Sequence, residues 1–242
     1  TPTTSSAASD VYKRQIDNNR VYACGYSEGG IFSYELACRL NNRIAAISSV
    51  SGSMLVDSFR DSYYNLGFCS PVHPTAILLI PGTNDFSPHS TYTGFQPYYM
   101  SADEITTYWS NYNNTDINPS IFQLPNINTS DGSTVEHRVW ENGDNCSRVE
   151  ELKVNGGGHD WPGTYGNMDI DATSEIWDFV SQFNINGLIN CSSTFQNNLT
   201  NSSKRKLVKT IDILGRENSK NLNNLLLYIY DDGSIDKVFI VE

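Results

Sequence analysis

Short runs in which at least half of the residues are apolar recur along the chain, and each is followed within two residues by a glycine. The runs cover residues 21–24, 43–50, 76–80 and 149–154. Residues 76–80 (AILLI) are apolar without interruption, which is typical of a central parallel strand covered on both faces. The pattern therefore predicts four short, largely buried strands.

Two further segments place apolar residues at helical spacing. The first follows directly after residues 21–24, and one of its faces carries Ile31, Tyr34, Leu36, Ala37 and Leu40. The second covers residues 172–183, with Asp171 as its N-cap and a buried stripe of Ile176, Trp177, Phe179, Val180 and Phe183. The order strand, helix, strand, strand, strand, helix predicts an α/β fold with a mostly parallel sheet and flanking helices.

Residues 86–146 show neither the strand pattern nor the helix pattern and are predicted to be a long, irregular segment. The segment is rich in aromatic residues: Tyr92, Phe95, Tyr98, Tyr99, Tyr108, Trp109 and Tyr112. These rings either pack the segment onto the domain or line a substrate groove, and the sequence leaves both interpretations open.

The C-terminal part of the chain has a different pattern. Short β segments are predicted at residues 207–214, 225–230 and 237–241, with a hairpin turn signal, DDGS, at residues 231–234. From residue 204 onward the chain carries seven basic and six acidic residues, a net charge of +1, whereas the remainder carries −12. A small, separate β unit of the sandwich type is therefore predicted here.

The domain organisation follows from these changes. Residues 1–15 contain the string SSAASDVYKRQ, which resembles a translated sequencing adaptor, so this segment is predicted to be non-native. Residues 16–186 are predicted to form a partial α/β domain that lacks its first sheet strands. Residues 187–203 are a predicted linker, and residues 204–242 form the small β unit.

Composition excludes several classes of function. The net charge of −11 argues against nucleic-acid binding. No run of 18 apolar residues occurs, so no membrane span is predicted. The five cysteines do not have metal-ligand spacing, so no metal site is predicted. Cys24 is expected to be a buried thiol, and a disulfide between Cys38 and Cys69 is left open.

The motif that carries chemistry is GYSEG at residues 25–29, which fits G-x-S-x-G. It stands between a predicted strand and a predicted helix, the context in which this motif forms a sharp turn that exposes the serine hydroxyl. Ser27 is therefore the candidate nucleophile. The backbone N–H of Glu28 is the candidate donor to a negatively charged oxygen formed during the reaction.

A serine needs a base, and the chain has four histidines. His159 lies in a glycine-rich loop, GGGHDWPG, after a predicted strand, and is the candidate base. His73 and His137 are expected to be structural or surface residues, and His89 to border the site without a catalytic role. Asp85 directly follows the AILLI strand and is the candidate acid, which gives the chain order Ser, Asp, His.

At these residues the chain resembles the secreted esterases grouped with polyhydroxybutyrate depolymerases, feruloyl esterases and acetylxylan esterases. The resemblance implies an α/β-hydrolase fold, a triad of Ser27, Asp85 and His159, and no cofactor. It also implies that Trp161 walls the substrate pocket, and we add Tyr26, beside the nucleophile, as a candidate substrate-binding residue. The matching stretches are residues 20–40, 73–90, 156–163 and 171–180.

Two departures from the family pattern lie near the acid loop, the segment of residues 81–90 that contains Asp85. Pro81 stands where members usually have a histidine, and Ser87-Pro88-His89 stands where a Val-Pro-Tyr-like ending is usual. Substrate preference is therefore left open.

Residues 204–242 resemble the C-terminal sorting domain of the type IX secretion system of Bacteroidetes. The matching parts are KRKLVKTIDILGREN and LLLYIYDDGSIDKVFIVE. The resemblance implies the secretion machinery as a partner and a secreted or cell-surface location. The alternative for this unit is an accessory β module that binds carbohydrate.

The sequence as a whole predicts a secreted serine carboxylic-ester hydrolase that acts on polyesters or on acyl esters of polysaccharides. The alternatives are a serine peptidase of the prolyl-oligopeptidase type and a non-catalytic surface binding module. Only 26 residues precede Ser27, and they do not hold the upstream loop that supplies a second oxyanion donor. We therefore expect the natural protein to begin upstream and this polypeptide alone to have little activity, since losing one such donor costs roughly 100- to 1000-fold.

Overall fold

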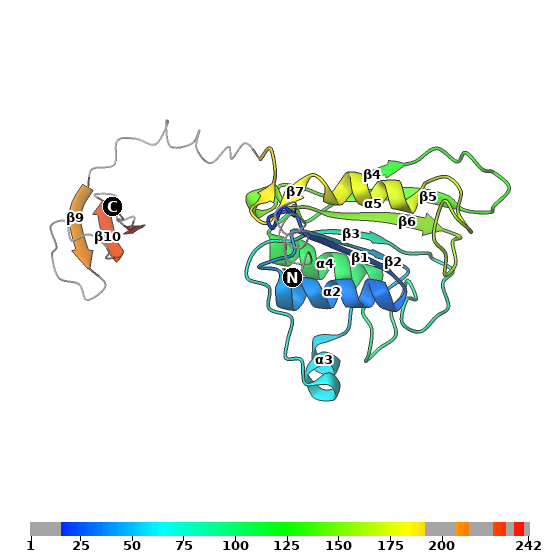
Figure 1. Ribbon diagram of the computed structural model, residues 1–242, viewed down its shortest axis with the longest axis horizontal. Coiled ribbons are helices and arrows are strands. Elements are labelled where there is room, and N and C mark those ends of the chain that lie inside the picture. The colour runs from blue at the N-terminus through cyan, green and yellow to red at the C-terminus, as the bar shows by residue number, and fades with distance from the viewer. Residues whose placement is uncertain (1–15, 192–206, 213–224, 231–234, 240–242) are drawn as a thin grey trace, which may run out of the picture. The chain divides into compact units, whose positions relative to one another are not determined.

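The computed structural model (Figure 1) describes residues 16–191, 207–212, 225–230 and 235–239. The chain divides into two compact units, Thr1–Cys191 and Ser192–Glu242. The predicted non-native segment and most of the predicted linker lie outside the described residues, so the proposed domain boundaries stay predictions.

A six-stranded mixed sheet forms the centre of the first unit, in the order β1-β2-β3-β6-β5-β4. The first four strands in this order run parallel, and β5 runs antiparallel to both of its neighbours. The four predicted strands and the α/β class are confirmed, with an antiparallel pair added at one edge. The strands are β1 (Tyr22–Tyr26), β2 (Ala46–Val50), β3 (Ala76–Ile80), β4 (Ser120–Gln123), β5 (Thr134–Trp140) and β6 (Val149–Asn155).

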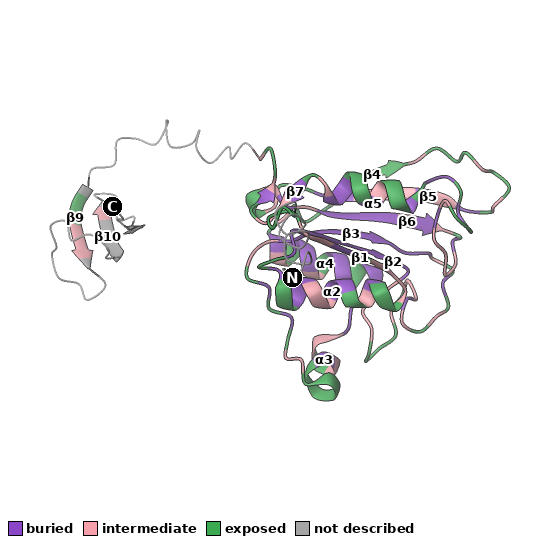
Figure 2. Cartoon of the chain, in the orientation of Figure 1, coloured by how far each residue is buried: buried purple, intermediate pink, exposed green. Residues whose placement is uncertain are grey.

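Helices cover both faces of this sheet. Helices α2 (Glu28–Leu40) and α4 (Ala102–Asn113) lie on one face, and α5 (Ala172–Val180) lies on the other (Figure 1). Side chains of a strand alternate between faces, so Ile77 and Leu79 of β3 join the apolar cluster of α2 and α4, whereas Leu78 and Ile80 join that of α5. The AILLI strand is therefore buried on both sides, as predicted (Figure 2).

The structure corrects the second predicted helix in part. Asp171 caps α5 as predicted, because its Oδ1 accepts hydrogen bonds from the backbone N–H groups of Thr173 and Ser174, at 2.8 and 3.2 Å. Trp177 is 62% exposed, because the buried face of the helix repeats at positions 172, 176 and 180. Phe183 is buried but lies beyond the helix, in strand β7 (Phe183–Asn184), which pairs with β8 (Gly187–Leu188).

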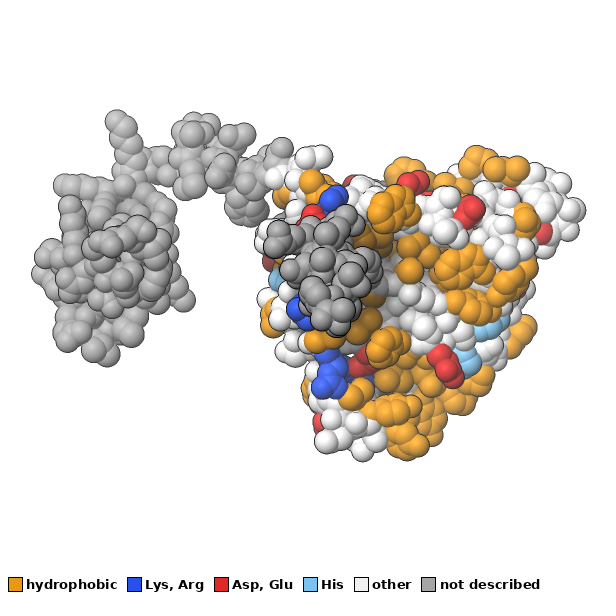
Figure 3. All heavy atoms as spheres, in the orientation of Figure 1, with side chains coloured by type: hydrophobic (Ala, Val, Ile, Leu, Met, Phe, Trp, Pro, Cys, Tyr) orange, Lys and Arg blue, Asp and Glu red, His pale blue; other side chains and the backbone are white. Residues whose placement is uncertain are grey.

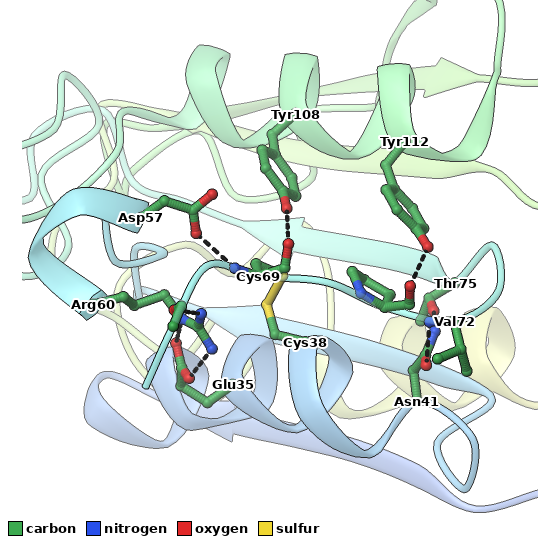
Figure 4. The surroundings of a disulfide bond; sticks show 12 residues. Glu35, Cys38, Asn41, Asp57, Arg60, Cys69, Val72, Thr75, Tyr108 and Tyr112 are labelled. Atoms are coloured by element: carbon green, nitrogen blue, oxygen red, sulfur yellow. Dashed lines mark hydrogen bonds and ion pairs between the residues drawn. A yellow bond between two sulfur atoms is a disulfide. The ribbon is translucent and has the colours of Figure 1, made fainter. Parts of the chain in front are cut away.

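The prediction of a long irregular segment at residues 86–146 is wrong. The segment contains α4, β4, β5 and the short 3-10 helix η1 (Asp144–Cys146). Helix α4 begins with a capping box between Ser101 and Glu104, and its Trp109 is fully buried. The hydroxyls of Tyr108 and Tyr112 donate to the carbonyls of Cys69 and Pro71, at 3.1 and 2.6 Å (Figure 4). The rings of α4 therefore pack the segment onto the domain.

Helix α3 (Asp57–Tyr64), which the sequence pattern missed, is joined to α2 by a buried ion pair. The guanidinium of Arg60 has no exposed surface, and its Nε and Nη2 both lie 2.6 Å from the carboxylate oxygens of Glu35 (Figure 4). Removing one partner of such a pair leaves a buried charge without compensation, so the pair fixes the position of α3.

The structure assigns all five cysteines: four form two disulfides and one is free. Cys38 and Cys69 form a disulfide, the possibility that the sequence left open (Figure 4), and Cys146 and Cys191 form a second one. The prediction that Cys24 is a buried thiol is wrong, because it is free and exposed. It lies on β1, an edge strand of the described sheet, which pairs on one side with β2.

The second unit contains a three-stranded antiparallel sheet in the order β11-β10-β9. Its strands are β9 (Leu207–Asp212), β10 (Leu225–Tyr230) and β11 (Ile235–Phe239), which agree with the predicted β segments to within a few residues. The predicted hairpin turn at residues 231–234 lies outside the described residues. No helix in the described part of the chain is long and apolar enough to cross a membrane.

Glu151 of β6 is a buried carboxylate in the central sheet. Its side chain has no exposed surface, and its Oε2 lies 3.3 Å from Nη1 of Arg138 on the neighbouring strand. Burial raises the pKa of Glu151 from its ordinary value of 4.5 to about 6, and the guanidinium of Arg138 only partly opposes this. The folded protein therefore binds a proton at Glu151 more tightly than the unfolded chain does.

We predict that Glu151 makes the free energy of unfolding fall between about pH 4.5 and about pH 6. The stabilisation by the neutral carboxyl is fully present below the unfolded pKa and is lost as the pH rises through the folded pKa. The shift corresponds to about 2 kcal/mol, because one pKa unit is worth about 1.4 kcal/mol. Urea unfolding of the wild type and of Glu151→Gln at several pH values measures this, because the glutamine variant lacks the group. A stability difference between the two that does not change with pH would contradict the prediction.

Candidate active site

Ser27 lies at the sharp turn between β1 and α2. Its backbone has φ 56° and ψ −121°, a left-handed φ that non-glycine residues seldom adopt. A backbone hydrogen bond from Ser27 N to the carbonyl of Val50, 2.9 Å long, holds the turn against the end of β2. The predicted strand–turn–helix context is therefore present, with Ser27 at its apex.

Close backbone contacts explain why glycines surround this turn. A Cβ on Gly25 would lie 2.2 Å from the carbonyl carbon of Gly29. A Cβ on Gly52, in the loop after β2, would lie 2.5 Å from the carbonyl oxygen of Ser27. A Cβ on Gly29, in contrast, would meet nothing within 4 Å. The turn therefore requires glycine before the serine and in the neighbouring loop, but not two residues after the serine.

The structure brings Ser27, His159 and Asp85 into one hydrogen-bonded chain. The Oγ of Ser27 lies 3.0 Å from Nε2 of His159, and Nδ1 of His159 lies 2.7 Å from Oδ2 of Asp85. Asp85 is buried, and its Oδ1 accepts a hydrogen bond of 2.9 Å from the backbone N–H of Ser87. A buried carboxylate that holds an imidazole against a serine hydroxyl is the arrangement that activates serine for attack on a carbonyl carbon.

Two loops at the carboxyl ends of β3 and β6 position the candidate acid, Asp85, and the candidate base, His159. The backbone N–H of Asn84 donates to the carbonyl of Gly157, at 2.8 Å, and that of Thr83 donates to Val154, at 3.0 Å. A Cβ on Gly82 would lie 2.3 Å from the carbonyl oxygen of Gly158. The loops thus contact each other through their backbones, which fixes the distance between Asp85 and His159.

Tyr26 and Trp161, the predicted substrate-binding residues, both lie beside the histidine loop. The hydroxyl of Tyr26 donates to the carbonyl of His159 at 2.7 Å, and the two rings are 4.9 Å apart. Burial raises the pKa of Tyr26, which keeps the hydroxyl protonated as a donor. Trp161 packs against the apolar cluster of α5 and against Tyr26, and its indole N–H donates to Thr173 Oγ1 at 3.3 Å. Tyr26 therefore helps to hold His159, the candidate base, in place.

The sequence analysis missed Ser90 of the loop after Asp85 and expected His89 only to border the site, but both residues reach the hydrogen-bonded chain. The hydroxyl of Ser90 donates to Oδ2 of Asp85 at 2.7 Å and lies 3.0 Å from Nδ1 of His159. Nε2 of His89 lies 3.0 Å from Oγ of Ser27. The only signal in the sequence was their place in the loop, four and five residues after Asp85.

The remaining predicted positions lie as follows. Glu28 is the first residue of α2, and the first backbone N–H groups of a helix have no partner within it, so this N–H is free to act as a donor. His73 contacts the carbonyls of Asn41 and Pro74, and His137 lies 2.7 Å from Glu150 on the neighbouring strand. Both histidines have structural partners outside the triad. Within the described residues, no group of three or more His, Cys, Asp or Glu could hold a metal ion.

Comparison with known proteins gives two relatives and no matching family model. The chain is 26% identical over 186 residues to the bifunctional acetylxylan esterase/xylanase XynS20E of Neocallimastix patriciarum, a match that covers 76% of this chain and 23% of that protein. It is 30% identical over 183 residues to feruloyl esterase B of Piromyces equi, over 72% of this chain and 29% of that protein.

Both relatives are fungal esterases, which supports an ester-hydrolysing enzyme. The chain spans less than a third of the length of either one.

We predict that the two glycines of the GYSEG motif respond in opposite ways to alanine. Gly25→Ala forces a Cβ into the backbone of Gly29 and should destabilise the protein by about 1–3 kcal/mol. Gly29→Ala, the matched control, places its Cβ in open space at the start of a helix and should leave stability unchanged or raise it by up to about 1 kcal/mol. The measurement is the thermal unfolding midpoint of each variant, compared with that of the wild type. Equal losses in both would show that the close contact at Gly25 is unimportant.

Proposed function

We propose that the protein is a serine carboxylic-ester hydrolase of the α/β-hydrolase class, in which Ser27 is the nucleophile, His159 the general base and Asp85 the orienting acid. The observation that carries the proposal is the continuous chain of hydrogen bonds from Ser27 Oγ to the buried Asp85, with donor–acceptor distances of 3.0 and 2.7 Å. The esterase relatives support the same class of reaction.

The geometry fits acyl transfer in two steps. Ser27 Oγ attacks the ester carbonyl carbon while its proton passes to Nε2 of His159, and Asp85 stabilises the resulting imidazolium. The carbonyl oxygen becomes negatively charged, and the backbone N–H of Glu28 donates to it. His159 then gives the proton to the leaving alcohol, which breaks the ester bond and leaves Ser27 acylated. In the second step water, deprotonated by His159, attacks the acyl-enzyme, and the carboxylic acid leaves as Ser27 regains its proton.

A groove beside the nucleophile supports a substrate with an apolar part. The groove has a volume of about 750 Å³ and follows helix α2, with Glu28 and Leu40 among its lining residues. Glu28 adjoins Ser27 in the chain, and Ser27 itself does not line the groove. Figure 3 shows hydrophobic side chains gathered over the region of α2 and α3. Together with the relatives, this favours acetyl or feruloyl esters of plant polysaccharides, and polyester chains are the second candidate. The apolar lining residues include Ile31, Phe32, Leu36, Leu55, Tyr64 and Tyr99.

We further propose that the enzyme works outside the cytoplasm and that residues 204–242 are its secretion sorting domain. Two disulfides, Cys38–Cys69 and Cys146–Cys191, support export, because disulfides persist in oxidising compartments. The assignment of residues 204–242 rests on their resemblance to type IX sorting domains. The partner of this segment would be the secretion machinery.

Labelling with a fluorophosphonate probe tests the proposed nucleophile. In the full-length protein, the probe should modify Ser27, as located by mass spectrometry, because only an activated serine reacts. Ser27→Ala should abolish labelling, and His159→Ala should lower ester hydrolysis by about 1000-fold or more. His137→Ala is the matched control, since His137 contacts Glu150 on β6 and should leave labelling intact.

Two outcomes would overturn the proposal. The absence of labelling in a folded full-length protein would exclude an activated serine. Faster cleavage of a peptide anilide than of 4-nitrophenyl acetate or methyl ferulate would favour a peptidase over an esterase.

A further inference from the structure

The hydroxyl of Ser27 lies between two imidazole rings. Its Oγ is 3.0 Å from Nε2 of His159 and 3.0 Å from Nε2 of His89. The two rings are nearly perpendicular, with an interplanar angle of 88° and centroids 5.7 Å apart. The mechanism above uses only His159, so a second histidine contacts the reacting oxygen without an assigned task.

The role of His89 depends on which atoms donate and which accept hydrogen bonds at Ser27 Oγ. Nδ1 of His159 carries a proton toward Asp85, so its Nε2 is the acceptor of the serine proton. A hydroxyl has one proton and two lone pairs, and with its proton given to His159 it can only accept from His89. Nε2 of His89 is therefore the donor, and this histidine cannot act as the base while His159 does.

The loop holds His89 in place from two sides. Its backbone carbonyl accepts a hydrogen bond of 2.9 Å from the N–H of Ser53, in the loop after β2. Its ring lies against Tyr99, with centroids 6.4 Å apart. Nδ1 of His89 makes no hydrogen bond within the described part of the chain, so the ring is held by packing and its one polar contact is the nucleophile.

We propose that His89 is a second catalytic histidine, whose Nε2–H stabilises negative charge on the reacting oxygens; the inference rests on the serine hydrolase function proposed above. In the free enzyme the N–H donates to Ser27 Oγ and keeps the serine proton directed at His159. When Oγ binds the carbonyl carbon it becomes a weaker acceptor, and the N–H of His89 is then released to donate to the oxygen on the same carbon, which becomes negative. No proton leaves His89 in either step.

The test is a kinetic comparison of His89 variants in the full-length protein. His89→Ala should lower kcat on 4-nitrophenyl acetate about 100-fold with KM changed by less than about threefold, as expected for a donor that acts in the transition state. His89→Gln keeps an N–H donor in the side chain and should recover activity to within about 10-fold of the wild type. His137→Gln is the matched control and should have wild-type kinetics. Thermal unfolding confirms that each variant is folded.

The outcomes separate this inference from the proposed function. Wild-type kcat in His89→Ala, with activity still lost in Ser27→Ala and His159→Ala, overturns the role of His89 and leaves the triad standing. Equal losses in His89→Ala and His89→Gln overturn the donor role. Activity that survives His159→Ala but not His89→Ala would make His89 the base and overturn both.

Discussion

The strained backbone of Ser27 is the constraint on which the site depends. A residue with φ near 56° costs of order 1–3 kcal/mol and persists only where its surroundings fix it. Here the surroundings are backbone atoms: the carbonyl of Val50 accepts the serine N–H, and Gly52 lies against the serine carbonyl. The end of β2 thus holds Ser27, the proposed nucleophile, and the parallel pairing of β1 with β2 brings the two together.

The same kind of contact joins the loop of Asp85, the proposed acid, to the loop of His159, the proposed base. The loops after β3 and β6 lie side by side because these strands are neighbours in the sheet, although Asp85 and His159 are 74 positions apart in the sequence. Their glycines allow backbone to approach backbone at Gly82 and Gly158. Each member of the hydrogen-bonded chain therefore comes from the carboxyl end of a different strand, and the order of the strands brings them together.

The sequence predicted the elements whose signals are local. Residues 76–80 are apolar at every position, which is typical of a strand covered on both faces. The turn at Ser27 and the loop of His159 also had local signals in the sequence, because glycines flank both residues. Helix α4 was missed because half of the residues on its buried face are polar. Strand β4 was missed because all four of its residues are exposed, so it has no apolar face to mark it. The position of His89 depends on the path of a loop, which no spacing in the sequence encodes.

The disulfide between Cys146 and Cys191 has a mechanical consequence. Cys191 is the last described residue of the first unit, so tension applied along the chain beyond it enters the unit at this cysteine. The disulfide transmits the force directly from Cys191 to Cys146, so the backbone of residues 147–190 does not carry it. His159 lies inside this bypassed segment together with β6 and α5, whereas Ser27 and Asp85 lie outside it. A pull from the C-terminal side therefore leaves the segment that carries the histidine without load until the bond is reduced.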